Sequence, residues 1–237
     1  MNEENNILEY LKKNRNDNVS IINFIENYPI YHMEKVGSSV FIKGVSDRNW
    51  IYISSKSSKE LELIKNKLSN SDKSFAVLED WMIPIITKGS KIKWKLSTMK
   101  LVLTNTETLP VPTHNMSKLI GEDSKFIYEN SDYKDYVSIE YITQCIENGI
   151  SSCVRIMDKP VAWGITQDDG AIGFLHVLPE YRKNGFGKDI TVDLISKVRN
   201  MGQIPFVHIE EKNDKSMKLA MSLGFTKNKV VSWLEID

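Results

Sequence analysis

The sequence predicts a mixed α/β protein, and two observations carry that prediction. A short apolar strand at 174–178 breaks at Pro179, continues into a glycine-rich turn and feeds a helix at 188–199. Both halves of the chain also follow one order of elements: a helical segment, three strands, a helix, a strand, a helix and a strand. With 237 residues, 41% of them hydrophobic, the chain can form one large or two small domains.

The first half begins with a helix at 5–13 and a second one that Asn18 would cap and Pro29 would end. Three strands follow, at 30–36, 40–45 and 50–55. Ser57 and Glu60 form a capping box that opens a helix through residue 68. The half closes with a strand at 75–79, a short helix at 80–86 and a strand at 91–103.

The second half follows a threonine- and proline-rich segment, 104–116, which has no periodic pattern and is the predicted linker. Beyond it, the apolar patterns indicate the following elements: a helix at 134–148, strands at 151–157 and 160–166, the strand, turn and helix of 174–199, a strand at 205–210, a helix at 214–223 and a strand at 229–236.

The glycine-rich turn has the pattern Arg-x-x-Gly-x-Gly, with Arg182, Gly185 and Gly187. Glycines let a backbone approach a diphosphate closely, and the unpaired N–H groups of a first helical turn point at such an anion. The residue pattern of this turn does not match a P-loop, a dinucleotide-binding fingerprint or an RNA-recognition strand. The remaining alternative is a tight turn without a ligand.

At residues 177–187, VLPEYRKNGFG, the chain resembles the acyl-CoA-binding motif of the GNAT superfamily of N-acyltransferases. The segment PFVHIEEKN at 205–213 and the later Leu223-Gly224-Phe225 resemble the next strand and helix of that family. The resemblance covers about residues 120–237 and is closest to the glycine N-acyltransferase branch. It implies a GNAT fold with a mixed sheet, and transfer of an acyl group from acetyl-CoA or another acyl-CoA to a primary amine.

The same resemblance implies direct attack by a small amine or amino acid in a ternary complex, without a metal. It places pantetheine between two splayed parallel strands, and homodimers are common in such folds. The positions that it assigns to acyl-CoA binding are Leu175, His176, Val177, Arg182, Lys183, Asn184, Gly185, Phe186, Gly187, Lys188, Asn213 and Ser216.

The groups that handle protons depart from the family pattern. Many members carry a tyrosine where this chain has Ala220, and others a glutamate where it has Ala171. His208 and Glu210 are the predicted catalytic pair, because residues two apart on a strand share a face. His176 and Asp169 are further candidates, although a strand histidine is more often structural. Two functions stay open: an N-acyltransferase and a non-catalytic acyl-CoA-binding sensor or scaffold.

The parallel between the two halves suggests a tandem of related domains, at 1–105 and 119–237 with a linker at 106–118. The turn expected in the first half reads SSKSSKE at 54–60 and has no glycine, which does not favour a diphosphate. We therefore expect a degenerate GNAT-like copy that has lost the cofactor. A mixed α/β domain of unrelated origin is the alternative.

The composition excludes some partners. Lysine plus arginine and aspartate plus glutamate are each 31, so the net charge of zero indicates neither nucleic acid nor an anionic membrane as partner. The polar, acidic N-terminus is unlike a signal peptide, and no apolar run is long enough to span a membrane. Two cysteines are too few for a disulfide framework or a zinc site, so we expect a cytoplasmic protein.

Overall fold

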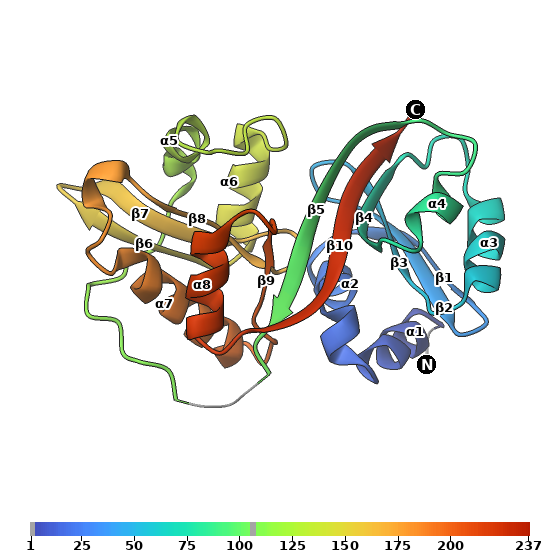
Figure 1. Cartoon of the computed structure of the whole chain (residues 1–237), viewed down its shortest axis with the longest axis horizontal. Coiled ribbons are helices and arrows are strands. Elements are labelled where there is room, and N and C mark those ends of the chain that lie inside the picture. The colour runs from blue at the N-terminus through green and yellow to red at the C-terminus, as the bar shows by residue number, and fades with distance from the viewer. Residues whose placement is uncertain (1–2, 105–107) are drawn as a thin grey trace. The chain divides into compact units, whose positions relative to one another are not determined.

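A computed structural model describes residues 3–104 and 108–237, and its helices and strands follow the predicted order (Figure 1). The chain forms two compact units. Unit 1 contains the residues up to Lys100 together with Ile209–Lys212 and Lys227–Asp237, and unit 2 contains Leu101–His208 and Asn213–Thr226. Residues 105–107 of the predicted linker, and with them the predicted boundary after residue 105, lie outside the described residues.

Unit 1 is built on a mixed sheet with the strand order β1-β2-β3-β4-β10-β5. The first three strands are antiparallel, β4 runs parallel to β3, and the C-terminal strand β10 runs antiparallel to β4. Its elements are α1 (Glu3–Lys12), α2 (Arg15–Asn27), β1 (Ile30–Val36), β2 (Ser39–Val45), β3 (Asn49–Ser54), α3 (Ser58–Lys67), β4 (Ser74–Glu79), α4 (Ile83–Ile86), β5 (Ile92–Val102) and β10 (Thr226–Ile236).

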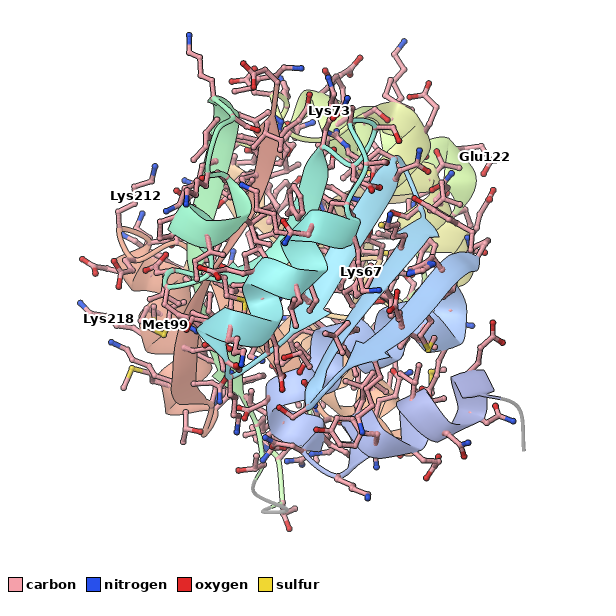
Figure 2. All side chains as sticks on the ribbon, turned by 90° about the vertical axis from the view of Figure 1, so that its right-hand side faces the viewer. Lys67, Lys73, Met99, Glu122, Lys212 and Lys218 are labelled. Atoms are coloured by element: carbon pink, nitrogen blue, oxygen red, sulfur yellow. The ribbon has the colours of Figure 1, made fainter. Side chains whose placement is uncertain are left out.

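The central strands β2, β3 and β4 have mostly buried side chains, and successive side chains of a strand point to opposite faces of the sheet. Ile51 and Ile53 pack with α3 and α4 in one core. Ile42 and Tyr52 pack with α1 and α2 in the other. The two pairs of helices therefore cover opposite faces of the sheet, as Figure 1 shows. Figure 2 looks onto the side of α3, where Lys67 pairs with Glu34 of β1 at 2.9 Å.

One predicted helix start in unit 1 is wrong and another is confirmed. Helix α2 begins at Arg15 with Asn14 at the N-cap position, so Asn18 is not its cap. Asn18 lies one turn into the helix and donates to the carbonyl oxygen of Leu11 at 3.0 Å. At α3, Ser57 caps the helix as predicted, by accepting from the Glu60 N–H at 3.2 Å.

The Glu60 carboxylate turns away from the predicted capping box. It accepts from the Ser38 N–H at 3.1 Å, in the turn between β1 and β2, and from the Ser39 hydroxyl at 2.6 Å, at the start of β2. The fold brings this turn to the start of α3, and its hydroxyls and N–H group attract the carboxylate away from Ser57. The Ser57 cap is therefore kept, while the contact that Glu60 would make in a capping box is replaced by contacts with Ser38 and Ser39.

Unit 2 has the antiparallel strands β6, β7 and β8, with β9 parallel to β8. Its second helix begins at Ile139 rather than at the predicted 134, because Ser138 caps it by accepting from the Tyr141 N–H at 3.1 Å. Its elements are η1 (Gly121–Asp123), α5 (Ser124–Glu129), α6 (Ile139–Asn148), β6 (Ser151–Ile156), β7 (Lys159–Thr166), β8 (Ile172–Val177), η2 (Pro179–Tyr181), α7 (Phe186–Asn200), β9 (Phe206–Ile209) and α8 (Asp214–Ser222).

Two layers of helices position β8. On one face, α5 and α6 pack around Trp163, which is 1% exposed. On the other face α7 lies close to the sheet at Gly164, where an added Cβ would be 2.7 Å from Leu194 Cδ1. This close approach packs the middle of α7 directly against β7, the strand beside β8. Within residues 3–104 and 108–237, no helix has the length and apolar character needed to cross a membrane.

Candidate functional site

The turn between β8 and α7 leaves the start of the helix without a side-chain cap. Gly185 occupies the N-cap position with φ +83°, a left-handed conformation that glycine adopts without strain. Lys183 is also left-handed, with φ +68°. Phe186 is buried and anchors the first turn of the helix. Since the first N–H groups of a helix have no intrahelical partners, this turn presents them to an anion.

Strands β8 and β9 separate close to where they pair. The parallel register joins Ile172 to Val207, whereas β8 continues along β7 as far as the pair of Val177 and Ala162. Phe174 has φ +48°, and the register between β7 and β8 shifts beside it. This bulge bends the strand. The resemblance predicts that pantetheine contacts backbone groups of Leu175 and Val177. Both residues lie on β8 after Ile172, the residue that pairs with β9.

The predicted residues 182–188 lie together in this turn, and some have partners within it. Arg182 Nε donates to the Val177 carbonyl oxygen at 3.1 Å, and Asn184 Nδ2 donates to the Tyr181 carbonyl oxygen at 3.1 Å. Lys183 and Lys188 are exposed at the start of the helix. Arg182 therefore ties the end of β8 to the turn, and the two lysines place positive charge beside the helix N-terminus.

Asp189 of α7 forms hydrogen bonds with two residues of the predicted linker. One oxygen of its carboxylate accepts from the Thr113 N–H at 2.7 Å, from the Thr113 hydroxyl at 2.8 Å and from the His114 N–H at 3.1 Å, and it lies 2.7 Å from His114 Nδ1. Burial alone would raise the pKa of Asp189, but these hydrogen bonds outweigh it and hold the pKa below its ordinary value. The ring of His114 also packs edge-on against Phe186 at 4.5 Å. Sequence reasoning missed this contact because it joins residues far apart in the chain.

Asn213 caps α8. Its side-chain oxygen accepts from the Ser216 N–H at 3.2 Å. Asparagine is among the preferred residues at this position, because its short side chain reaches back to the first turn. The contact of Asn213 with a pantetheine arm stays a prediction.

His208 has a carboxylate beside it, and that carboxylate belongs to Asp169. His208 Nε2 lies 3.0 Å from Asp169 Oδ2, with exposed side-chain fractions of 4% and 1%. The other oxygen of Asp169 accepts from the Ala171 N–H at 3.0 Å. The parallel pairing of Ile172 with Val207 brings the turn before β8 next to His208. The sequence named Asp169 as a further candidate, but its contact with His208 depends on this tertiary pairing, which local patterns do not predict.

Glu210 lies one residue beyond β9, which ends at Ile209 rather than at the predicted residue 210. Its carboxylate forms an ion pair with Lys212 at 2.9 Å. The expected strand geometry, in which Glu210 follows His208 on one face, therefore does not extend to this residue.

His176 stacks on Trp163 with ring centroids 4.9 Å apart, as expected for a packed histidine. The pKa of His176 is lowered, mainly because the ring is buried. The positive charge of Arg182 lowers the pKa as well, while the negative charge of Asp132 opposes the shift. Ala171 and Ala220, at the two positions where the resemblance predicts a proton-transfer group, are buried. Among the described residues, no group of three or more histidine, cysteine, aspartate or glutamate side chains could hold a metal ion.

Comparison with known proteins agrees with this geometry. Residues 152–234 match the family model described as FR47-like protein. A GCN5-related N-acetyltransferase from Kribbella flavida superposes with a TM-score of 0.61 at 12% identity, covering 93% of this chain and 94% of its own. The chain has the GNAT fold. An acetyltransferase of the GNAT family from Colwellia psychrerythraea gives a TM-score of 0.51 at 16% identity, covering 94% of this chain and 97% of its own.

A Drosophila protein is also similar in structure, with a TM-score of 0.68, 15% identity and coverage of 84% of this chain and 74% of its own. These coverages exceed the segment matched by the family model, so the likeness of fold extends into the first half of the chain. A search of curated proteins returned no match.

Proposed function

We propose that the protein is an acyl-CoA-dependent N-acyltransferase, with acetyl-CoA as the first donor to test. The observation that carries this proposal is the left-handed Gly185 at the open N-terminus of α7, directly after the bulged strand β8. A diphosphate at this turn would accept from backbone N–H groups and be favoured by the helix dipole. The GNAT fold of the chain and the match to the FR47-like model support the same ligand.

We propose the binding residues that the resemblance assigns. Lys183, Asn184, Gly185, Phe186, Gly187 and Lys188 would hold the diphosphate, with Arg182 keeping the turn against β8. The backbone of Leu175, His176 and Val177 would pair with the pantetheine arm along the separated part of β8. Asn213 and Ser216, at the start of α8, would contact the same arm.

In the reaction, acyl-CoA supplies an activated thioester carbonyl. An acceptor amine would form the new C–N bond as the C–S bond breaks, so one proton leaves the amine and one reaches the thiolate. A backbone N–H of β8 would stabilise the developing oxyanion, and positioning would supply much of the rate. We propose His208 as the base that takes the amine proton, with Asp169 fixing the orientation of its ring. Glu210 stays the predicted partner of His208, although it lies beyond the end of β9.

The acceptor that we propose is a small primary amine or an amino acid, in line with the resemblance to the glycine N-acyltransferase branch. That resemblance rests on the run LPEYR at 178–182 and on His208 in the strand before Asn213. It names a class of acceptor, and the panel of amines described below tests it.

A second candidate function is a non-catalytic binder of acyl-CoA. Alanines at 171 and 220 remove two groups that relatives use for proton transfer, and the side chain of His208 is only 4% exposed. Both functions predict binding at Gly185. Only the transferase predicts turnover.

The two units also support our proposal that the chain is a tandem of GNAT-like domains at 1–105 and 119–237, joined by a linker at 106–118. In each unit three antiparallel strands lead to one parallel pair, β3 with β4 and β8 with β9. A helix connects the two strands of each pair, α3 in unit 1 and α7 in unit 2. In unit 1 the corresponding turn lacks glycine, in keeping with a copy that has lost the cofactor.

The test is thiol release from acetyl-CoA and longer acyl-CoAs, with a panel of amino acids and polyamines. We expect amine-dependent release, loss of release in Gly185→Glu, and slower turnover in His208→Gln with unchanged acetyl-CoA affinity. Binding of acetyl-CoA without release for any amine of the panel would favour the binder. Absence of binding would remove both functions.

A further inference from the structure

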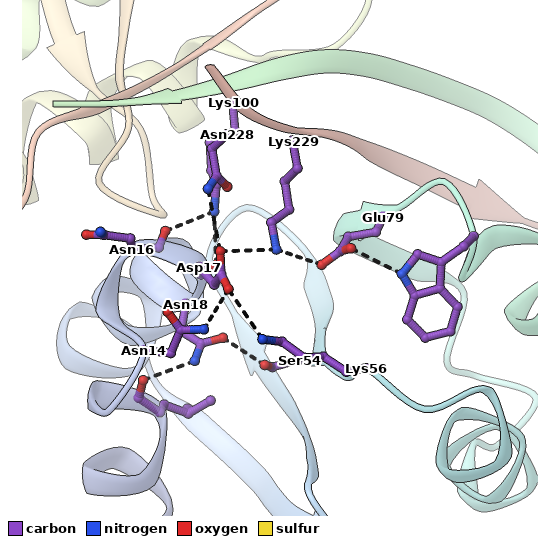
Figure 3. Close-up of polar contacts among 12 residues, drawn as sticks. Asn14, Asn16, Asp17, Asn18, Ser54, Lys56, Glu79, Lys100, Asn228 and Lys229 are labelled. Carbon is purple, nitrogen blue, oxygen red and sulfur yellow. Dashed lines mark hydrogen bonds and ion pairs between the residues drawn. The ribbon is translucent and has the colours of Figure 1, made fainter. Parts of the chain in front are cut away.

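Unit 1 contains a cavity of about 260 Å³ that the proposed transferase chemistry does not use. It lies between the first turns of α2 and the strands β3, β4, β5 and β10, and every residue that lines it belongs to unit 1. Figure 3 shows the polar side chains that gather there around Asp17, from α2, from the end of β3 and from β10.

The cavity opens where two parallel strands separate. Strands β3 and β4 pair at Tyr52 and Ala76. Beyond that pair, Ser54 continues along β2 and Glu79 along β10. Val77, at the point of separation, has φ +58°, a strained backbone for a β-branched residue. Such strain persists only where the surroundings impose it, and it is concentrated at binding sites.

The charges that line the cavity favour an anion. Four lysines face two carboxylates, which leaves an excess of two positive charges; these residues are Lys13, Lys56, Lys100, Lys229, Asp17 and Glu79. Lys229 lies 2.8 Å from Glu79 and 3.4 Å from Asp17, and Lys56 lies 3.8 Å from Asp17. Burial would raise the pKa of Asp17, but Lys229 and the amides of Asn14 and Asn228 outweigh it, so the pKa is lowered and the carboxylate stays ionised.

Lys100 places an ammonium deep in unit 1, since its side chain is among the largest that are fully buried. Its Nζ donates to the carbonyl oxygens of Asn16 at 3.2 Å and Asp17 at 2.9 Å (Figure 3). These bonds hold the charge at the wall of the cavity. Because the local dielectric is low, an anion at that wall would interact with it more strongly than in water.

Ser20 supplies the observation that points most directly to a ligand. Ser20 lines the cavity and is 2% exposed, yet its hydroxyl has no hydrogen-bond partner within the described residues. Buried hydroxyl groups in folded proteins are almost always hydrogen-bonded. An oxygen of a bound ligand would satisfy this one.

We propose that this cavity binds a small carboxylic acid. Lysine ammonium groups and the Ser20 hydroxyl would hold the carboxylate, while Ile21, Ile53 and Val231, which also line the cavity, would contact a short carbon skeleton. This apolar lining favours an organic acid over inorganic phosphate. The volume is below the range typical of drug-sized ligands, so the acid is small. The proposal does not depend on acyl transfer by unit 2.

The test is calorimetric titration of the full chain with succinate, citrate, L-glutamate and inorganic phosphate at low ionic strength. We expect at least one of the three carboxylic acids to bind with one site per chain. Lys229→Gln should weaken that binding by at least about tenfold, since it removes a charged partner. Lys227→Gln is the matched control, because Lys227 lies on the same strand but is exposed outside the cavity, and its affinity should stay unchanged.

Ser20→Ala separates loss of the ligand from loss of the fold. Removing a buried hydroxyl without a partner should leave the melting temperature unchanged or raise it, while the affinity falls about tenfold. The proposal is overturned if none of the acids binds at millimolar concentration, or if only phosphate binds. It is also overturned if Lys229→Gln and Ser20→Ala both leave the affinity unchanged.

Discussion

The two strand-to-helix junctions of the chain, from β3 to α3 and from β8 to α7, start their helices in opposite ways. At α3, the Ser57 side chain caps the helix by accepting from the Glu60 N–H. At α7, Gly185 in a left-handed conformation leaves the first turn without a side-chain cap. A helix whose own side chain accepts from the first turn has fewer donors for a ligand. The comparison indicates that α7 is open to an anion and α3 is closed.

Each of the two helices also carries a carboxylate in its first turns that fastens a neighbouring loop. Glu60 of α3 accepts from Ser38 and Ser39, and Asp189 of α7 accepts from Thr113 and His114. In α7 the carboxylate is turned to the linker. Gly185 stays exposed, with His114 Cε1 3.8 Å from where a Cβ would lie. A carboxylate that binds a neighbouring segment is therefore found both at the junction with a side-chain cap, in unit 1, and at the junction without one, in unit 2.

The largest effect is expected for Gly185→Glu. A side chain at φ +83° strains the turn, and its carboxylate would occupy the proposed diphosphate position. Losing two charge-assisted hydrogen bonds should weaken acetyl-CoA binding by at least about 100-fold. Gly202→Glu is the matched control, because Gly202 has φ +71° with nothing near its Cβ position. Calorimetry should find that Gly202→Glu binds acetyl-CoA as tightly as the wild type. Equal losses of affinity in the two variants would mean that backbone strain, and not the proposed site, caused the loss.

A smaller effect is expected for Asp189→Asn, which keeps the shape of the side chain but removes its charge. The four contacts from Thr113 and His114 would weaken, lowering the free energy of unfolding by about 1.5–3 kcal/mol at pH 7. The folded-state pKa of Asp189 is lowered, so its contribution is present above an unfolded pKa of about 4 and is lost as the pH falls through the folded value.

Denaturant unfolding between neutral and acidic pH measures this contribution. The difference in stability between the wild type and Asp189→Asn should shrink on acidification. A difference that stayed constant with pH would contradict the assignment of the charge to these contacts.

Asn213 offers a test in which stability and binding separate. Asn213→Ala should cost about 1 kcal/mol of stability through loss of the cap on α8, and Asn213→Ser should restore it. If the amide also contacts pantetheine, the serine variant should keep a raised KM for acyl-CoA despite its restored stability. Thermal unfolding and steady-state kinetics on the same samples would decide; full recovery of KM in Asn213→Ser would limit Asn213 to the cap.

The smallest effect is expected at the closed junction. Ser57→Ala removes the cap of α3 and should lower the free energy of unfolding by about 1 kcal/mol. Acetyl-CoA affinity should not change, because the proposed site lies at α7. An altered affinity in a direct titration would mean that the two junctions are not independent.

Local patterns were enough to predict most elements and the turn around Gly185. The strand, turn and helix from β8 to α7, the cap at Asn213 and the cap at Ser57 are each set within a few residues of sequence. The helix start at Asn14 was missed because Asn18, also a good capping residue, stands just after it. Competing caps of similar strength cannot be ranked from propensity alone.

Contacts between distant segments were the part that local patterns could not supply. Asp169 meets His208 because β8 and β9 pair at one point, and Asp189 meets His114 because the linker returns to α7. Likewise, β10 pairs with β4, so most of the last strand belongs to unit 1 although it ends the second half of the sequence. Each of these contacts depends on the register of a sheet or the path of a loop.

Calorimetric titration of the full chain with acetyl-CoA tests the central claim most directly, since the claim is that α7 is open and α3 is closed. The account predicts one acetyl-CoA per chain, with binding lost in Gly185→Glu and retained in Ser57→Ala and Gly202→Glu. Two molecules per chain, or one whose affinity does not depend on Gly185, would contradict it.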